Sequence, residues 1–229
     1  MRTIGIIVAM DCEIQQLKNR IEIAEEKQIC NTTFYTGTYK EKEVVFTTAG
    51  IGKVNAAITT MLMIEHFKPE LIINTGIAGG YEKTLQPLDV VVATKVLYSD
   101  VDMTAPAAGC YPYGQLEGCP EYFVPSYEFS KEVENVVYGT ILTGDQFVVD
   151  YSTVDLMVKT KFEKYDVVAF DMESGSISHV CDKNNTKFLI IRAISDIIGS
   201  TSPFDYATFS KTASNKVADI VLESVISNL

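Results

Sequence analysis

The sequence predicts a single α/β domain over residues 1–229, with a mixed central β-sheet flanked by helices. Short and almost uninterrupted apolar runs recur along the chain, segments with helical apolar spacing separate them, and two strand-like runs flank a polar turn. We find no linker, repeat or low-complexity tract that indicates a second domain. A chain of 229 residues buries roughly 70% of its unfolded surface, so the core needs neither a disulfide nor a structural metal.

The apolar runs are typical of strands buried on both faces, as in parallel sheets covered by helices. They cover residues 4–9, 71–73, 90–93, 167–170 and 188–194. The first run imitates a signal peptide for a few residues, but Asp11 and Glu13 follow it directly, and we interpret it as a buried first strand. No apolar stretch approaches the roughly 18 residues of a membrane span, so we expect a soluble, cytoplasmic protein.

Helical spacing is found in residues 11–21 and 54–67, and residues 206–227 predict a long closing amphipathic helix. Residues 33–38 and 43–48 are interpreted as a hairpin. Residues 98–126 combine tyrosines, prolines and glycines with little periodicity. A loop of this length inside a compact domain usually has a function.

Charge and composition exclude several classes of protein. The chain has 19 Lys and Arg against 30 Asp and Glu, and the net charge of −11 repels nucleic acid and anionic membranes. Five cysteines without a CxxC pair favour a reducing compartment. Only two histidines occur, with no HExxH motif and no clustered cysteines, so we predict no metal site.

Acidic residues and glycines follow the apolar runs, at the sheet edge where open α/β proteins bind ligands. The acids are Asp11, Glu13, Asp145, Asp171, Glu173 and Asp196, and glycine-rich turns are predicted at residues 49–53 and 75–80. One acid after a strand is more often a helix cap than a catalyst, and each glycine turn alone is a weak signal. Several acids at one edge are harder to dismiss, because packed like charges destabilise a fold unless a ligand uses them.

Six motifs in order make the chain resemble bacterial 5′-methylthioadenosine/S-adenosylhomocysteine nucleosidases, of the purine nucleoside phosphorylase superfamily. They are IGIIVAMDCE at 4–13, AGIGKVNAA at 49–57, IINTGIAGG at 72–80, YGQLEGCP at 113–120, FDMES at 170–174 and IRAISD at 191–196. The resemblance implies a nucleoside phosphorylase-like fold and hydrolysis of the N-glycosidic bond of 5′-methylthioadenosine and S-adenosylhomocysteine, and of 5′-deoxyadenosine as well. It also implies a homodimer without metal or organic cofactor, acting on a small nucleoside in methionine salvage and methylation clean-up.

The resemblance assigns the reaction to three carboxylates. Glu13 matches the general base that activates water, and a base must lie within hydrogen-bond reach of that water. Asp196 matches the acid that protonates adenine N7, a role that needs a carboxyl still protonated near neutral pH. Glu173 matches the residue that holds the ribose hydroxyls and favours positive charge on the sugar.

The remaining assignments also come from the resemblance and concern substrate binding. Met172 packs beneath the sugar, Arg192 and Ser195 support the water site and the acid, Phe147 stacks on adenine, and the Val148 backbone reads the adenine edge. Met10, Ile51 and Tyr206 line the alkylthio pocket, Ala78 and Gly79 belong to the matched glycine motif, and Tyr111 or Pro106 extends to the partner subunit's site. By default Met10, Met172, Phe147 and an acid-paired Arg192 are simply core residues.

The sequence departs from the family at Ile77, where a serine is common, and in a longer loop between Thr104 and Tyr113. Related phosphorylases bind phosphate where Glu13 stands here, and a carboxylate repels phosphate, which favours hydrolysis. Futalosine-type hydrolases share the acids and differ in the 5′ pocket, where Met10 and Ile51 suit a methylthio group better. A non-catalytic nucleoside-binding module would need the pocket but neither acid, so the presence of both Glu13 and Asp196 speaks against this alternative.

Overall fold

The computed structural model describes residues 3–126, 136–200 and 203–229, with the side chains of residues 203–208 left out. The strands are β1 (Ile4–Val8), β2 (Glu22–Ile29), β3 (Thr32–Tyr39), β4 (Lys42–Thr48), β5 (Leu71–Gly80), β6 (Val90–Tyr98), β7 (Val136–Thr143), β8 (Val167–Asp171) and β9 (Lys187–Ile197). The helices are α1 (Asp11–Lys18), α2 (Lys53–Phe67), α3 (Tyr151–Lys161), α4 (Ser174–Lys183) and α5 (Pro203–Ile220). A 3₁₀ turn covers Pro106–Ala108, and α5 continues into a π-helical turn and a 3₁₀ turn up to Asn228.

The nine strands found in the described residues belong to one mixed sheet in the order β2-β3-β4-β1-β5-β8-β7-β6-β9, and β5 also pairs with β9. This extra pairing closes β5, β8, β7, β6 and β9 into a ring. The β5–β9 pairing is parallel from Leu71 to Gly80, whereas β5 meets β8 only at Gly79 and Gly80, antiparallel. The predicted α/β class with a mixed sheet and flanking helices is therefore confirmed.

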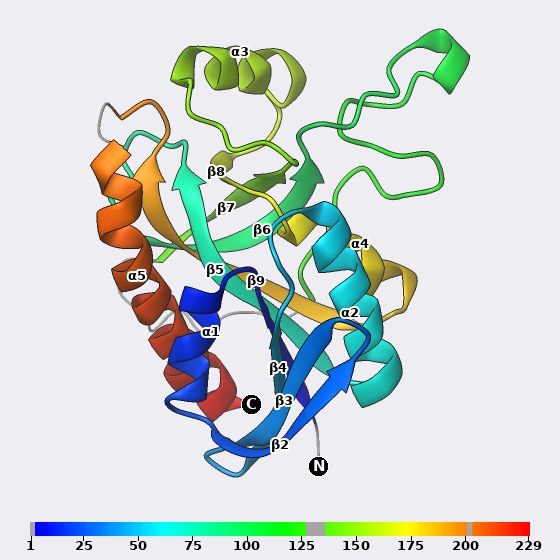
Figure 1. Ribbon diagram of the computed structural model, residues 1–229. Coiled ribbons are helices and arrows are strands. Elements are labelled where there is room, and N and C mark those ends of the chain that lie inside the picture. Colours follow the sequence, from blue (N-terminus) through cyan, green and yellow to red (C-terminus); the bar gives the residue numbers. More distant parts are fainter. Residues whose placement is uncertain (1–2, 127–135, 201–202) are drawn as a thin grey trace.

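Helices cover both faces of the sheet, with α1 and α5 on one side and α2 and α4 on the other (Figure 1). Alternate residues of the central strands reach opposite layers. Ile6 packs with Leu17 of α1 and Val217 of α5, while its neighbour Ile7 packs in the layer of Met63 from α2. Because both faces are buried, the strands are continuous apolar runs, as the sequence predicted.

A third apolar cluster lies under α3, where Val154, Val158 and Phe162 pack against Leu142 and Phe170. In Figure 1 this helix lies above the strand ends of the sheet. Asp150 caps it by accepting hydrogen bonds from the amides of residues 152 and 153, and the helix was not predicted from the sequence.

Several predicted boundaries need correction. The helix expected over 11–21 ends at Lys18, although Ile21 is buried just beyond it. The hairpin is confirmed as β3 and β4, but β2 was missed because only Ile29 of its residues is buried, which leaves no apolar alternation. Residues 75–80 are not a turn, since they continue β5 along β9.

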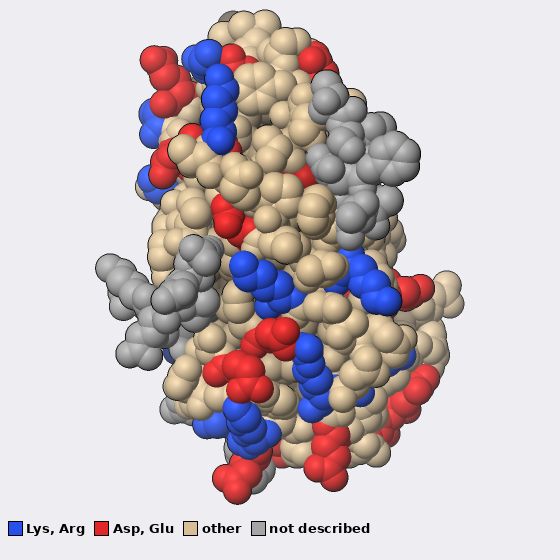
Figure 2. All heavy atoms as spheres, turned by 90° about the vertical axis from the view of Figure 1, so that its left-hand side faces the viewer, with Lys and Arg blue, Asp and Glu red and all other residues tan. Residues whose placement is uncertain are grey.

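Surface charges of both signs are interspersed in the lower half of the face shown in Figure 2. Ion pairs join Arg20 to Asp219 and Lys40 to Glu223. Among the residues that the structure describes, no helix is both long and apolar enough to cross a membrane.

We predict that Gly139→Ala destabilises the ring of strands. A methyl group at Gly139 in β7 would lie 2.4 Å and 2.8 Å from the two γ-carbons of Val168 in β8, and 3.1 Å from the Asp166 carbonyl oxygen. Overpacking of this kind costs about 1–3 kcal/mol in the free energy of unfolding, which urea denaturation measures.

The control for this prediction is a double-mutant cycle with Val168→Ala, which removes the two opposing methyl groups. The double variant is expected to be more stable than the sum of the single effects by at least about 0.5 kcal/mol. Strict additivity would contradict the packing explanation.

Candidate active site

One pocket lies where several strands end, and including its open mouth it encloses about 620 Å³. Volumes of roughly 300–1,000 Å³ are usual for small-molecule sites. The lining residues come from the ends of β1, β5, β8 and β9 and from the loops before α2 and α3. They are Ala9, Met10, Glu13, Ile51, Ile77, Ala78, Gly79, Gln146, Phe147, Val148, Phe170, Asp171, Met172, Glu173, Arg192, Ser195 and Asp196.

The pocket brings together the residues to which the resemblance assigns a role, apart from Tyr111, Pro106 and Tyr206. Of the acids expected at this sheet edge, Asp11 and Asp145 are not among the residues that line it. The Tyr206 side chain lies outside the described residues. Tyr111 belongs to the segment after β6 that extends away from the sheet at the upper right of Figure 1, and it is not among the residues lining the pocket of this subunit. Where the residues lie is observed, whereas their roles remain predictions.

Glu13 is held by backbone amides. Its Oε2 accepts hydrogen bonds from the Ala9 amide at 2.9 Å and the Met10 amide at 2.8 Å, and its Oε1 accepts from the Ile77 amide at 3.1 Å. Burial raises the pKa of Glu13, opposed by the Arg192 charge and by these amides. Glu13 lies in the first turn of α1 and caps that helix end, as expected of an acid after a strand. Its carboxylate nevertheless lines the pocket.

Arg192 is fully buried at the floor of the pocket. Its Nε donates to Asp171 Oδ2 at 2.9 Å, and its Nη2 forms an ion pair with the same oxygen at 2.7 Å. Nη2 also donates to Asn74 Oδ1 at 2.7 Å. Glu173 Oε2 lies 3.4 Å from the same nitrogen. An unpaired charge at this depth would be strongly destabilising, so the acids and the guanidinium require each other.

A glycine at position 76 permits this arrangement. A methyl group there would lie 2.6 Å from Arg192 Nη1 and 2.6 Å from Glu13 Oε1. Both are polar atoms of buried side chains that have little room to move. Gly76 therefore permits the close approach of β5 to the charged groups and does not form a turn.

The carboxyl of Glu173 has a strongly perturbed pKa. Burial raises its pKa to about 7, with the Arg192 charge opposing the rise and the Asp171 charge adding to it. Its Oε1 accepts a hydrogen bond from the Gly52 amide at 3.0 Å. This bond connects the loop before α2 with the residue before α4.

Asp196 lies on β9, one residue after Ser195. The Ser195 hydroxyl donates to Asp196 Oδ1 at 2.6 Å and lies 3.3 Å from the Ala78 carbonyl oxygen. The strand was predicted to end at residue 194, but it continues to Ile197 along β5. Both side chains are therefore placed by a paired strand and not by a loop.

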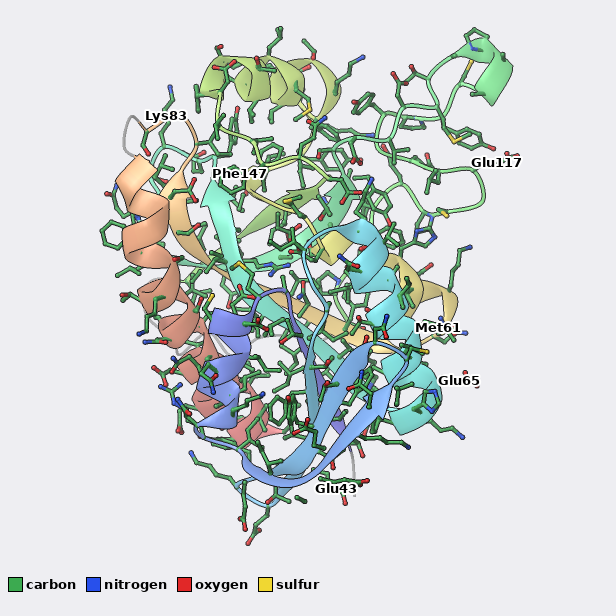
Figure 3. The ribbon with its side chains drawn as sticks, in the orientation of Figure 1. Glu43, Met61, Glu65, Lys83, Glu117 and Phe147 are labelled. Atoms are coloured by element: carbon green, nitrogen blue, oxygen red, sulfur yellow. The ribbon has the colours of Figure 1, made fainter. Side chains whose placement is uncertain are left out.

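The mouth of the pocket is apolar and exposed. Phe147 is 60% exposed and Ile51 is 52% exposed, so neither belongs to the core. Figure 3 shows Phe147 close to the end of β5. An aromatic ring left exposed at the mouth of an acidic pocket is available to pack against a bound ligand.

Sequence reasoning did not single out three lining residues, Ala9, Gln146 and Phe170, or Asn74, which accepts a hydrogen bond from Arg192. Asp171 and Ile77 were noted in the sequence but received no binding role, and both line the pocket. The sequence indicated that Asp171 belongs to the site, because it is an acid at the end of a buried run and two residues before Glu173. The indication for Asn74 was weaker: it is a polar residue directly after the apolar run 71–73. Among the described residues, no group of three His, Cys, Asp or Glu side chains is arranged to hold a metal ion.

Comparisons with known proteins place the chain in one family. The family model described as phosphorylase superfamily matches residues 3–226. A curated 5′-methylthioadenosine/S-adenosylhomocysteine nucleosidase from Oceanobacillus iheyensis is 42% identical, covering 97% of this chain and 98% of that protein.

Two solved structures are similar along the whole chain. An S-adenosylhomocysteine nucleosidase from Streptococcus pyogenes, in complex with 5-methylthiotubericidin, superimposes with a TM-score of 0.90 at 34% identity, covering 100% of this chain and 97% of that one. A futalosine hydrolase from Helicobacter pylori also gives 0.90, at 28% identity, covering 100% and 98%.

We predict that Glu173 makes stability depend on pH. Because its pKa rises from 4.5 to about 7 on folding, the folded chain keeps a proton between these values that the unfolded chain releases. The stability that Glu173 contributes is therefore fully present below about pH 4.5 and is lost as pH rises through 7. Glu173→Gln has no such proton to lose. The free energy of unfolding of this variant minus that of the wild type should therefore increase with pH, by up to roughly 1.4 kcal/mol per unit of pKa shift.

Melting temperatures of both proteins between pH 4.5 and 8 test this. Taking the difference between them removes the opposite contribution of His179, whose pKa burial lowers. Glu121→Gln is the control, because its lysine and tyrosine partners lower the pKa of that carboxyl. A flat difference curve for Glu173→Gln would show that its pKa is close to normal.

Proposed function

The chain belongs to the 5′-methylthioadenosine/S-adenosylhomocysteine nucleosidases of the phosphorylase superfamily, and from this membership we propose how its pocket works. The enzyme hydrolyses the N-glycosidic bond of these two nucleosides and releases adenine and the 5′-thio-substituted ribose. The observation that carries the proposal is the meeting of Glu13, Glu173 and Asp196 around one apolar-mouthed pocket.

Glu13 is the general base in this proposal. Its three amide partners hold the carboxylate in one position, and its raised pKa makes it a stronger base than an ordinary carboxylate. It takes a proton from the water that attacks the anomeric carbon. Arg192 supports that water site, since its charge lies beside Glu13 and stabilises the ionised form.

Asp196 is the general acid that delivers a proton to adenine N7, so that adenine leaves as a neutral base. The Ser195 hydroxyl donates to Oδ1, which supports Oδ2 as the oxygen that carries the proton. Glu173 accepts the ribose hydroxyls and stabilises the positive charge that develops on the sugar. Met172 packs beneath the sugar, Phe147 stacks on adenine, the Val148 backbone reads the adenine edge, and Ala78 and Gly79 complete that wall.

Water is favoured over phosphate as the nucleophile. Arg192 is the one cationic side chain among the described lining residues, and it is already engaged by Asp171, Asn74 and Glu173. Ile77 contributes no hydroxyl. A phosphate here would face four acidic side chains, Glu13, Asp171, Glu173 and Asp196, against this one cation, which is electrostatically unfavourable.

The 5′ substituent lies against Met10 and Ile51 in this proposal, with Tyr206 as a third member. Apolar walls suit a methylthio group, and we propose that 5′-deoxyadenosine is accepted as well. The reaction then serves methionine salvage and the removal of methylation by-products. The similarity to the Helicobacter futalosine hydrolase concerns the shared fold, and the 5′ pocket has to distinguish the substrates.

We also propose a homodimer in the cytoplasm. Ile51 and, along α2, Val54, Ile58 and Met61 follow each other at helical spacing and are all exposed, and Figure 3 shows Met61 on the outer side of α2. Such a stripe is more typical of a subunit interface than of a free surface. The extended segment after β6, with Tyr111 or Pro106, is suited to reach the partner's pocket. Free thiols at all five cysteines favour a reducing compartment.

We predict that 5′-methylthioadenosine yields adenine and free methylthioribose at a rate unchanged by added phosphate. Chromatographic separation of the products, in phosphate-free buffer and in phosphate, measures this. A sugar 1-phosphate formed only with phosphate would make the enzyme a phosphorylase. No adenine in either buffer would leave the futalosine-type hydrolase and the binding module as the remaining interpretations.

We further predict that Glu13→Gln and Asp196→Asn each lose at least about 10²-fold in turnover, the usual contribution of a general acid or base. Both changes keep the size of the side chain while removing its proton transfer. Wild-type rates in both variants would overturn these two roles. Thermal unfolding curves serve as the control that each variant is folded.

A further inference from the structure

Asp100 joins two walls of the pocket without lining it. It lies two residues after β6, and Lys53 Nζ lies 2.7 Å from each of its carboxylate oxygens. Its Oδ2 also accepts a hydrogen bond from the Asp145 amide at 2.9 Å. One carboxylate thus binds the first residue of α2 and the loop between β7 and α3.

Asp145 completes the connection from its side of the pocket. Its Oδ1 accepts a hydrogen bond from the Lys53 amide at 2.8 Å, and its Oδ2 lies 4.0 Å from Lys53 Nζ. The N-cap of α2 is Gly52, which has no side chain to cap the helix. Asp145, from the loop between β7 and α3, instead supplies an acceptor for the Lys53 amide in the first turn of α2. Negative charge is favourable at this end of a helix.

The ion pair between Lys53 and Asp100 is partly buried, whereas the Asp145 side chain is 46% exposed. The side chains of Lys53 and Asp100 are 22% and 19% exposed, so solvent screens their attraction less than that of a surface pair. Lys53 Nζ also lies 5.4 Å above the centre of the Tyr98 ring. Asp100, Lys53 and Asp145 are called the loop latch below.

In the sequence, Lys53 and Asp145 of the loop latch are close neighbours of residues that line the pocket. Ile51 and Gly52 precede Lys53, and the Gly52 amide donates to Glu173. Phe147 and Val148 follow Asp145 within three residues. Phe147 and Ile51 lie on the two loops that the latch joins, and the hydrogen bonds of Asp100 and Asp145 form a polar connection between these loops.

We propose that Asp100 is a positioning residue that fixes the adenine-stacking wall relative to the ribose-binding wall. It acts through Lys53 and Asp145 and sets how tightly the nucleoside is bound. It has no described contact with Glu13 or Asp196, so the bond-breaking step itself depends on it little. The inference rests on the proposed function through the stacking role of Phe147.

The test is Asp100→Asn, which keeps the shape of the side chain but removes its charge. We expect KM for 5′-methylthioadenosine to rise about tenfold or more, as for loss of hydrogen bonds to a charged group, with kcat within about threefold of the wild type. Asp100→Glu, which restores the charge, should recover part of the loss. Asp145→Asn should give the same pattern and serves if Asp100→Asn does not fold.

Glu121→Gln is the matched control. Glu121 lies in the same segment after β6 and is paired with Lys164 and Tyr165, away from both pocket walls. This variant should leave KM unchanged. An unchanged KM in Asp100→Asn, or a fall in kcat without a rise in KM, would overturn the proposal.

A second readout needs no substrate. The chain contains no tryptophan, so Phe147→Trp introduces a single fluorescent reporter into the loop. Adding Asp100→Asn to that variant should lower the fluorescence anisotropy of the reporter, because the loop becomes freer. An unchanged anisotropy would contradict the latch. If the anisotropy falls as expected but the wild-type protein releases no adenine, the positioning role of Asp100 is retained and the proposed function is rejected.

Discussion

The buried guanidinium of Arg192 is the group on which the site depends. Carboxylates from three elements face one volume there, and without a central cation their mutual repulsion and desolvation would favour their neutral forms. Arg192 binds Asp171 through two nitrogens and lies near Glu173 and Glu13. Nη2 also donates a hydrogen bond to Asn74. Because the charges of Asp171, Glu173 and Glu13 surround this one cation, the site has no excess positive charge to attract an anionic nucleophile.

The closed ring of strands explains how these groups reach one place. The pairing of β5 with β9 runs from Leu71 to Gly80, and it carries β9 past the predicted strand end so that Ser195 and Asp196 lie beside Ala78 and Gly79. The same pairing brings Gly76 next to Arg192. A side chain at Gly76 would occupy the space of the charged network. Sheet closure and catalytic geometry are thus consequences of the same backbone contacts.

The sequence predicted the features that depend on burial and on strand ends. The apolar runs gave the central strands and the acids behind them gave most of the pocket, whose assignment to roles came from the family resemblance. What it missed depends on partners distant in the chain. β2 forms by backbone pairing with β3 although its side chains are exposed, and the strand character of residues 75–80 follows from β9. The significance of Asn74 becomes visible only with Arg192 beside it.

The pocket divides into a rigid floor and a mouth held by fewer contacts. At the floor, Glu13 is bound by three amides and Arg192 by three side chains, so the protein itself holds the carboxylate that we propose as the base, as electrostatic preorganisation requires. At the mouth, Ile51 and Phe147 lie on loops joined through ion pairs behind them. The proposed 5′ wall combines Ile51 at the mouth with Met10, whose amide binds Glu13 at the floor. A 5′ substituent in this proposal therefore contacts both parts of the pocket, so selection among 5′ substituents depends on how the mouth is held relative to the floor.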